Sequence, residues 1–322
     1  MSLKQFVKFV EKKRKSRKDL SYSFFFRTFA NDLEGQRKEL DMNDLKISVI
    51  MSIYKSDVPE YVRIALDSLL NQTRLPDEIV IVADGPVPAE LEQEVQSSKF
   101  KVQSLKLPVE VTYLPQEKNG GLGEAMRIAV EAAKYPYLAR MDSDDICLPD
   151  RFEKQMKCFE EDPELSIVGG MITEFDGEPE NIIAERILPL DDAGIKKMMR
   201  GRCAVNHVTV IFKKEDLLRS GNYQPFWKQE DHYLWARMME HGCKFRNIPD
   251  IVVNVRSGRD QLARRGGWRF YKSVVRVFWY MYKHKLISFG YFLYICAVRG
   301  IVQLLMPNWL RTWVYMKFLR KS

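Results

Sequence analysis

An acidic cluster offers the clearest chemistry in this sequence. Asp142, Asp144 and Asp145 stand within four positions, directly after the apolar run YLARM. Crowded carboxylates repel one another, so a folded chain keeps them ionised only where water or a cation offsets their charge. The cluster is therefore a solvated turn, a calcium loop or a metal site that takes part in a reaction.

A calcium loop of the EF-hand type is excluded. Such a loop carries oxygen ligands at its first, third and fifth positions and glycine at its sixth. Counted from Asp142, the fifth position is Ile146, the sixth is Cys147, and Pro149 interrupts the remainder. Without the glycine the chain cannot make the required turn, so the solvated turn and the reactive metal site remain.

Strand and helix patterns alternate around this cluster. Near-continuous apolar runs, typical of strands buried on both faces, alternate with segments whose apolar residues recur at helical spacing. This alternation predicts an α/β fold with a mostly parallel, doubly wound sheet. The predicted strands are 47–53, 77–85, 109–115, 137–141 and 165–176, and the predicted helices are 59–73, 89–96, 121–135 and 149–162.

Polar residues follow three of these strands. Tyr54 and Asp57 follow the first, Asp84 follows the second, and the acidic cluster follows the fourth. Ligands of open α/β sheets bind outside the carboxyl ends of the strands, so these side chains are expected along one edge. This convergence favours a metal site, whose cation can bridge the two phosphates of a nucleotide diphosphate leaving group.

The glycines of GGLGEA, at 120–125, raise the alternative of a dinucleotide-binding loop. That fingerprint belongs to the turn after the first strand and ends in a third Gly or Ala at a fixed offset. Here the motif follows the third strand, and Met126 stands at the third glycine's position. An oxidoreductase is therefore not expected.

The net charge of +8 is unevenly distributed along the chain. Residues 1–20 hold eight Lys or Arg against two acids, and residues 256–322 hold fourteen against one. Because the basic charge is confined to the ends, nucleic acid is not expected as a partner. The five cysteines show no paired spacing and follow no secretory signal, which indicates reduced thiols and a cytoplasmic location.

Both basic ends are also rich in aromatic residues, but the longest uncharged run of the C-terminal end, 286–298, is too short to span a bilayer. The composition is typical of helices that lie against an anionic membrane surface, although helices packed on the domain would show it too. The predicted organisation is a basic amphipathic extension at 1–45, a catalytic domain at 46–255 and a basic, aromatic helical tail at 256–322.

The motifs together resemble family-2 glycosyltransferases with the GT-A nucleotide-sugar-binding fold, in particular the bacterial exopolysaccharide and O-antigen branch of the amylovoran biosynthesis type. The resemblance covers roughly residues 46–272. It implies inverting transfer of a hexose-type sugar from a nucleoside diphosphate sugar, with UDP expected, to a hydroxyl of a lipid-linked oligosaccharide. It also implies Mn²⁺ or Mg²⁺ and a position at the inner face of the cell membrane. The carrying segments are SVIMSIYKSDVPEYVRIALDSLLNQTRLPDEIVIVADGPVP, NGGLGEAM, ARMDSDDICLPDRFEKQ, NHVTVIFKK, EDHYLWARMMEHGCKFRNIPD and RRGGWRFY.

The resemblance assigns roles to several acids. Asp142 and Asp144 correspond to the family's D-x-D pair, with Asp144 as the direct metal ligand and Asp142 in contact with the ribose or the metal. Asp231 matches the acid taken as the catalytic base, and Glu230 stands beside it. In-line displacement needs one base opposite the leaving group, which a single carboxylate satisfies.

A second set of residues is expected to contact the nucleotide sugar. Asp84 matches the aspartate that reads the edge of the base, while Tyr54 and Asp57 frame the base and the ribose. For His207, the simpler explanation is a buried, hydrogen-bonded imidazole. The arginines of the RRGG loop could close over the diphosphate, but the simpler explanation is that they belong to a basic surface. The remaining candidates of this set are Arg140, His207 and Arg265.

Some positions depart from the family or have no role in it. Many relatives carry two aspartates after the second strand, where this chain has Ala83 and Asp84. Arg127 stands about where the family has Asn, and we expect it to face solvent. Trp227 is a candidate for stacking on an acceptor sugar, and Asp145 is unassigned.

Two alternative functions differ from sugar transfer. A nucleotidyltransferase would usually carry a glycine-rich basic loop after the first strand, and SIYKSDVPE contains no glycine. A non-catalytic, glycosyltransferase-like scaffold would bind sugar nucleotide without turnover. The acids at 84, 142, 144 and 231 argue against that scaffold.

Overall fold

A computed structural model describes residues 45–257, 266–307 and 310. The chain divides into two compact units, Met1–Leu45 and Lys46–Ser322, and the description below concerns the second. The predicted N-terminal extension up to residue 44, the loop arginine Arg265 and most of 308–322 lie outside the described residues.

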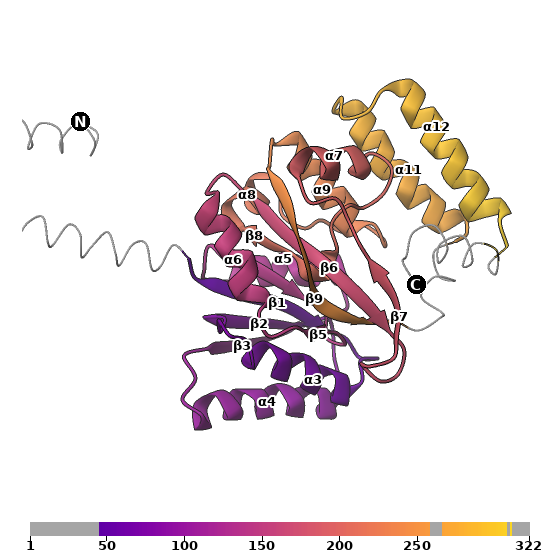
Figure 1. Cartoon of the computed structure of the whole chain (residues 1–322). Helices are drawn as coiled ribbons and strands as arrows, with labels where there is room; N and C mark the ends of the chain where they lie inside the picture. The colour runs from indigo at the N-terminus through magenta and orange to yellow at the C-terminus, as the bar shows by residue number, and fades with distance from the viewer. Residues whose placement is uncertain (1–44, 258–265, 308–309, 311–322) are drawn as a thin grey trace, which may run out of the picture. The chain divides into compact units, whose positions relative to one another are not determined.

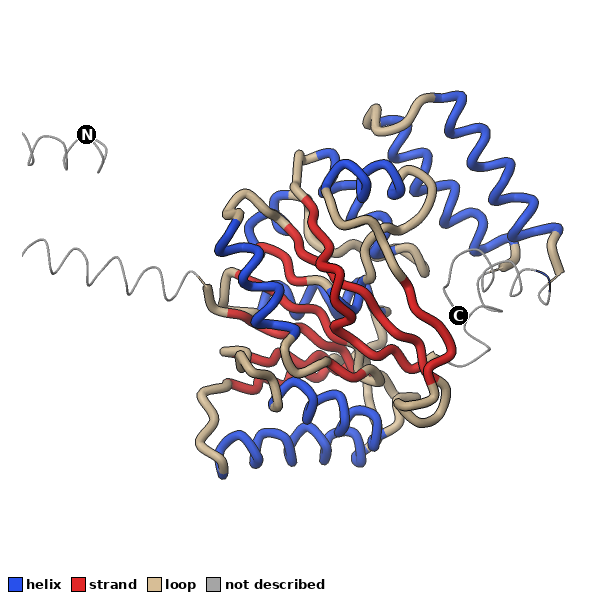
Figure 2. Tube along the Cα trace, viewed as in Figure 1, coloured by secondary structure: helices blue, strands red, loops and turns tan. Residues whose placement is uncertain are grey.

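The described residues form one nine-stranded sheet in the order β3-β2-β1-β4-β8-β6-β9-β5, with β7 paired to β6 (Figures 1 and 2). The pairs joining β3, β2, β1 and β4 are parallel. β8 then runs antiparallel to β4, so the sheet is mixed beyond β4. The strands are β1 (Ile47–Ile53), β2 (Glu78–Ala83), β3 (Glu110–Pro115), β4 (Tyr137–Met141), β5 (Ile146–Cys147), β6 (Ile167–Phe175), β7 (Ile182–Arg186), β8 (Ile211–Lys213) and β9 (Phe245–Arg256).

Helices cover both faces of this sheet. The described helices are α3 (Pro59–Leu70), α4 (Ala89–Ser104), α5 (Leu122–Ala132), α6 (Arg151–Glu161), α7 (Asp192–Met199), α8 (Lys214–Arg219), α9 (Glu230–Glu240), α11 (Trp268–Lys283) and α12 (Phe289–Gly300), with a 3-10 turn η1 (His207–Thr209) and a π-helical turn η2 (Ile301–Leu305). α3 and α4 pack against each other on one face, and α5 lies on β1 and β2 on the other (Figure 1). On the α5 face, one core joins Met126, Leu138, Phe212 and Trp235, all fully buried.

The predicted α/β fold is confirmed, and its parallel half follows directly from the sequence. β2 and β4 are buried at every position, as expected of strands covered on both faces. Because β1, β2 and β4 run in parallel, their carboxyl ends share one edge. The residues that follow those ends are therefore brought to the same side of the sheet.

The C-terminal helices share a hydrophobic cluster with the sheet domain. Phe270, Val274 and Phe278 on α11 are buried in a cluster with Ala236 of α9. β9 itself runs to Arg256, one residue past the boundary predicted at 255/256. Among the described helices, none is both long enough and apolar enough to cross a bilayer.

Gly169→Ala should destabilise the fold by about 1–3 kcal/mol, the usual range for overpacking a core. A Cβ at Gly169 would lie 2.3 Å from Oδ1 of Asn247. That side chain is buried and donates to the carbonyls of Pro189 and Ala204, at 2.7 and 3.0 Å, so it cannot move away freely. Urea unfolding measures the loss.

The matched control for this substitution is Gly290→Ala. A Cβ at Gly290 meets nothing within 4 Å, and the residue lies inside α12. Alanine is favoured over glycine in a helix by about 0.5–1 kcal/mol, so this variant should be slightly stabilised. Equal stability of the two variants would contradict the packing argument at Gly169.

Candidate active site

The loops after β1 and β4 are joined by Asp57. Its Oδ2 accepts hydrogen bonds from the backbone N–H of Tyr54 at 2.9 Å and from Ser143 Oγ at 2.7 Å. Burial raises the pKa of Asp57, against these hydrogen bonds, and the charge of Asp142 raises it further. The structure thus brings Asp57 and Asp142 together, as the sequence predicted for this edge.

Asp84 holds the turn that leads into α5. Its carboxylate accepts hydrogen bonds from Asn119 Nδ2 and Gly120 N, both at 2.7 Å, and from Gly121 N at 3.0 and 3.1 Å. Gly121 has a φ of +83°, a conformation that L side chains rarely adopt. The contact of Asp84 with a nucleobase stays a prediction. The carboxylate would have to accept that hydrogen bond in addition to those from the loop it already holds.

Arg140 forms a bidentate ion pair with Asp142 at the end of β4. The side chain of Arg140 is 3% exposed and that of Asp142 is 36% exposed. A planar guanidinium bound through two nitrogens fixes both the position and the orientation of the carboxylate. The buried guanidinium of Arg140 therefore holds the partly exposed carboxylate of Asp142 in place at the edge of the sheet.

Asp144 and Asp145 occupy different environments. Burial raises the pKa of Asp144 to about 6, and the charges of Asp142 and Asp57 add to the effect. Asp145 is fully buried and accepts a hydrogen bond at 2.9 Å from the backbone N–H of Arg256. Asp145, which the sequence left unassigned, therefore connects the acidic cluster to the end of β9.

Arg256 is a site-forming residue that the sequence did not reveal. Its Nη1 donates to the carbonyl of Gly177 at 2.7 Å, and its guanidinium lies 3.7 Å from the ring centre of Tyr61 and 4.6 Å from that of Phe175. In the sequence it reads as the first cation of the basic tail. The antiparallel pairing of β9 with β5, which follows Asp145 directly, places it beside the acidic cluster.

The acids of α9 lie near the start of α5, where a Cβ at Gly123 would be 3.7 Å from Cβ of Glu230. Asp231 Oδ1 accepts from His232 N at 2.7 Å, and the thiol of Cys203 lies 3.6 Å from Asp231 Oδ2. The pKa of Glu230 is raised to about 7, mainly by burial. The negative charges of Asp231 and, to a smaller extent, Asp142 also raise it. The start of α9 is thus within electrostatic reach of the end of β4.

His207 lies in a buried aromatic group behind these acids. Its Nε2 is 2.7 Å from the hydroxyl of Tyr223, and its ring packs edge-on against Trp235 with the centres 5.8 Å apart. Burial lowers the pKa of His207 well below its usual value, and the charge of Arg140 lowers it further. The imidazole is therefore neutral and acts first as a packing partner, while its contact with a diphosphate stays a prediction.

Arg127 and Trp227 are engaged within the protein. Arg127 is partly exposed and pairs along its own helix with Glu124 at 2.6 Å and Glu131 at 2.7 Å. The ring of Trp227 has Arg269 at 4.5 Å from its centre, as well as a contact with Phe270. Stacking of Trp227 on an acceptor sugar stays a prediction and would have to share the ring with this cation.

A buried polar network supports the end of β4, and no sequence signal indicated it. Arg151 Nη2 donates to the carbonyl of Arg140 at 2.9 Å, and the Arg151 side chain is completely buried. Gln155 Nε2 donates to the carbonyls of Val168 and Thr209, at 2.9 and 2.8 Å. α6 therefore ties β4, β6 and η1 together directly beneath the acidic cluster.

The predicted metal ligands fit a hard cation by their chemistry. Within the described residues, no group of three or more His, Cys, Asp or Glu side chains is arranged to hold a metal ion by itself. The charge of Asp142 nevertheless raises the pKa of both Asp57 and Asp144, and the charge of Asp57 also raises that of Asp144, the sign of carboxylates whose charge is incompletely offset. Carboxylate oxygens suit Mg²⁺ or Mn²⁺, which are commonly bound by one or two carboxylates together with substrate phosphates.

Comparison with known proteins identifies related sequences. Residues 48–219 match the family described as glycosyl transferase family 2. A Haemophilus influenzae protein named as an uncharacterized glycosyltransferase is 39% identical, across 86% of this chain and 100% of its own length. The amylovoran biosynthesis glycosyltransferase AmsE of Erwinia amylovora is 38% identical, across 72% of this chain and 84% of that protein.

Two further proteins bear on chemistry and on fold. The Escherichia coli UDP-Gal:alpha-D-GlcNAc-diphosphoundecaprenol beta-1,3-galactosyltransferase is 30% identical, across 86% of this chain and 97% of its own. The crystal structure of residues 1–349 of TarS from S. aureus superposes with a TM-score of 0.57 at 16% identity, covering 84% of this chain and 78% of that one. At that identity the likeness supports the fold alone.

Glu230→Gln should stabilise the protein above neutral pH. The pKa of Glu230 is raised from 4.5 to about 7, so the folded state keeps a proton that the unfolded state releases. Its stabilising contribution is present below pH 4.5 and is lost as the pH rises through 7. At pH 8 the variant should gain about 2 kcal/mol, after allowance for partial exposure.

Urea unfolding of both proteins at pH 5 and pH 8 measures this effect. The control is Asp176→Asn, which changes an exposed carboxylate and should leave the pH dependence as it is. A Glu230→Gln variant with the wild-type pH dependence would show that the carboxyl of Glu230 does not titrate abnormally.

Proposed function

Because the chain belongs to glycosyltransferase family 2, we propose that it transfers a hexose-type sugar, with inversion, from a UDP-sugar to a hydroxyl of a lipid-linked oligosaccharide in surface polysaccharide synthesis. The observation that carries this proposal is that the charge of Asp142, which follows β4 and also acts on Asp144, reaches Glu230 beside Asp231 at the start of α9. The names of the amylovoran and undecaprenol relatives support the pathway and the lipid-linked acceptor.

Asp231 serves as the base in this mechanism. It takes the proton of the acceptor hydroxyl while that oxygen bonds to the anomeric carbon, and the bond from that carbon to the diphosphate oxygen breaks on the opposite side. UDP leaves with the bonding electron pair. The contacts with His232 N and Cys203 hold the carboxylate in one orientation, which favours attack from a single face.

Glu230 moderates the charge beside the base. With a pKa raised to about 7, it is partly protonated at neutral pH, which reduces its repulsion of the Asp231 carboxylate. A protonated carboxyl also provides a hydrogen-bond donor to a sugar hydroxyl. Both acids are partly buried, and beside a forming oxocarbenium-like centre they would place negative charge where positive charge develops.

The donor is held by the edge of the parallel half. Asp144 and Asp142 would hold Mn²⁺ or Mg²⁺, with Asp142 oriented by Arg140. When bound, the cation neutralises charge on the diphosphate leaving group. The remaining proposed donor contacts are Tyr54, Asp57, Asp84, Arg140, His207 and Arg265.

We also propose that α11 and α12 contact an anionic membrane surface. Residues 266–307 contain no Asp or Glu and six Lys or Arg. The outer face of α12, which we define as Phe289, Leu293 and Tyr294 together with Ile301 and Leu305 of the following turn η2, is more than half exposed at each position. Exposed apolar residues beside Lys and Arg are typical of helices lying at a membrane interface.

Asp144→Ala and Asp231→Asn should each lower sugar transfer by at least about 100-fold, the order of magnitude that general base catalysis supplies. The measurement is release of UDP and formation of a lipid-linked product, with Mn²⁺ or Mg²⁺ and after addition of EDTA. The matched control Asp176→Asn, on an exposed carboxylate, should retain activity. Near wild-type transfer by both site variants would exclude this mechanism, whereas donor binding without turnover in the wild type would favour the non-catalytic scaffold.

The double variant Leu293→Ser with Ile301→Ser should bind phosphatidylglycerol-containing vesicles at least about 30-fold more weakly than the wild type. Each substitution removes apolar surface worth roughly 1–2 kcal/mol when transferred from water. Sedimentation with vesicles measures the change. Phe100→Ser removes an even more exposed apolar side chain from α4 and should have no effect. Equal binding of all three proteins would contradict a membrane contact through α12.

A further inference from the structure

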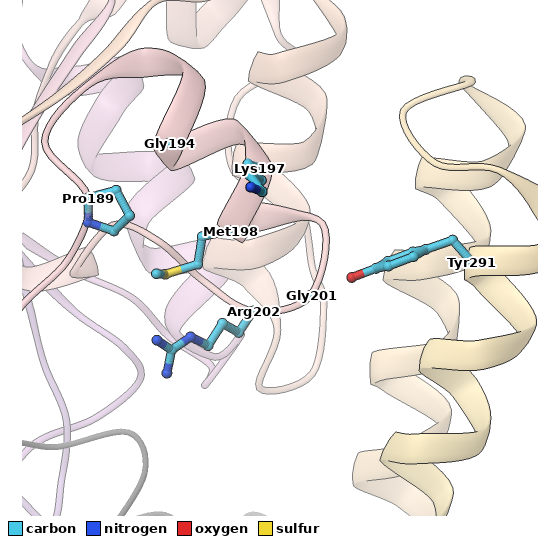
Figure 3. Close-up of a pocket in the computed structure, with 7 residues that line it drawn as sticks. All are labelled: Pro189, Gly194, Lys197, Met198, Gly201, Arg202 and Tyr291. Atoms are coloured by element: carbon cyan, nitrogen blue, oxygen red, sulfur yellow. The ribbon is translucent and has the colours of Figure 1, made fainter.

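An open depression of about 460 Å³ lies between α7 and α12 (Figure 3). Tyr291 extends from α12 toward the turn at Gly201, and a Cβ at Gly201 would lie 3.2 Å from the Tyr291 hydroxyl. The lining residues are Pro189, Gly194, Lys197, Met198, Gly201, Arg202 and Tyr291.

The charged side chains that line this depression are cations. Lys197 and Arg202 supply them, and no carboxylate is among the lining residues. The neighbouring Lys196 is already paired with Asp192 at 2.8 Å, whereas Lys197 makes no side-chain hydrogen bond or ion pair within the described part of the chain. The depression therefore combines positive charge, a hydroxyl and the apolar surface of Met198 and Pro189.

A short stretch of chain connects the depression to Asp231. Cys203, two residues after Gly201, places its thiol 3.6 Å from Asp231 Oδ2. Two residues span at most about 7 Å. On the other side, Arg299 of α12 donates to the carbonyl of Gly201. The turn at 201–203 thus lies between the proposed base and the helix whose outer face is apolar.

We propose that this depression binds the phosphate groups of the lipid-linked acceptor. Lys197 and Arg202 provide charge-assisted hydrogen bonds to a diphosphate, Tyr291 adds a hydroxyl donor, and the lipid chain continues over the outer face of α12. The short separation from Asp231 suits a lipid-linked acceptor in which few sugars separate the diphosphate from the reacting hydroxyl. The identity of the occupant rests on the proposed function, whereas the anion site itself rests on the lining residues.

The test uses farnesyl diphosphate as a short prenyl diphosphate. Calorimetric titration of the full chain in EDTA keeps this probe from binding through a metal ion at the donor site. Lys197→Gln and Arg202→Gln should each weaken its binding about tenfold, the effect of losing one charge-assisted contact. Tyr291→Phe should have a smaller effect in the same direction.

The matched control is Lys157→Gln, on an exposed lysine of α6 that has no ion pair within the described residues. It should bind farnesyl diphosphate as the wild type does. UDP binding in the presence of Mn²⁺ should be unchanged in all of these variants, and so should their melting temperatures. Farnesol should bind much more weakly than the diphosphate, and inorganic pyrophosphate should bind with an intermediate affinity.

Three outcomes would overturn the proposal. The first is wild-type affinity for farnesyl diphosphate in both charge variants. The second is displacement of the probe by UDP, which would place it in the donor site. The third is equal binding of farnesol, which would leave the cations without a role. Absence of sugar transfer in the wild type, with sensitivity to Lys197 intact, would instead reject the transferase proposal and retain the anion site.

Discussion

The ion pair between Arg140 and Asp142 is the interaction on which the site depends. Arg140 is buried beneath a group of carboxylates, and its charge acts on Asp144, Asp145 and Glu230. Removing one partner of a buried pair typically leaves an uncompensated charge at a cost of several kcal/mol. The guanidinium therefore orients Asp142, and its positive charge reduces the repulsion among the acids that follow β4 and those that begin α9.

The backbone of Arg140 is in turn held by a second buried cation, Arg151. Arg151 is completely buried, and its guanidinium donates to backbone carbonyls, including that of Arg140, rather than to a carboxylate. Burial lowers its pKa accordingly. Because Arg151 donates to backbone carbonyls, it holds the end of β4 in place without neutralising a carboxylate of the site. α6 thus supplies rigidity below the cluster, while the acids above it keep their negative charge for ligands.

The sequence predicted the parallel half of the fold and its edge residues well, because each strand there is a local apolar run followed by its own polar residues. Asp57 and Asp142 lie together for that reason. Arg256, Arg151 and the thiol of Cys203 could not be predicted, because their roles arise from pairings with distant segments. Local composition assigned Arg256 to a basic tail, but strand pairing places it in β9 beside the acidic cluster. Arg151 was predicted only as part of a helix, and its burial beneath β4 is what the local pattern does not show.

The two halves of the sheet divide the proposed work between donor and acceptor. The donor side uses turns that directly follow β1, β2 and β4, so a short, ordered set of motifs is enough to encode it. The acceptor side depends on α7, α9 and α12, which meet through Cys203, His232 and Arg299 and are separated along the chain. The family match ends at residue 219, before α9 begins at Glu230. The match therefore includes the proposed metal ligands and α7, but it stops short of α9, which carries the proposed base, and of α12. We therefore expect acceptor choice to depend on the tertiary contacts around the 201–203 turn, because these contacts join α7, α9 and α12 without involving the turns that follow β1, β2 and β4.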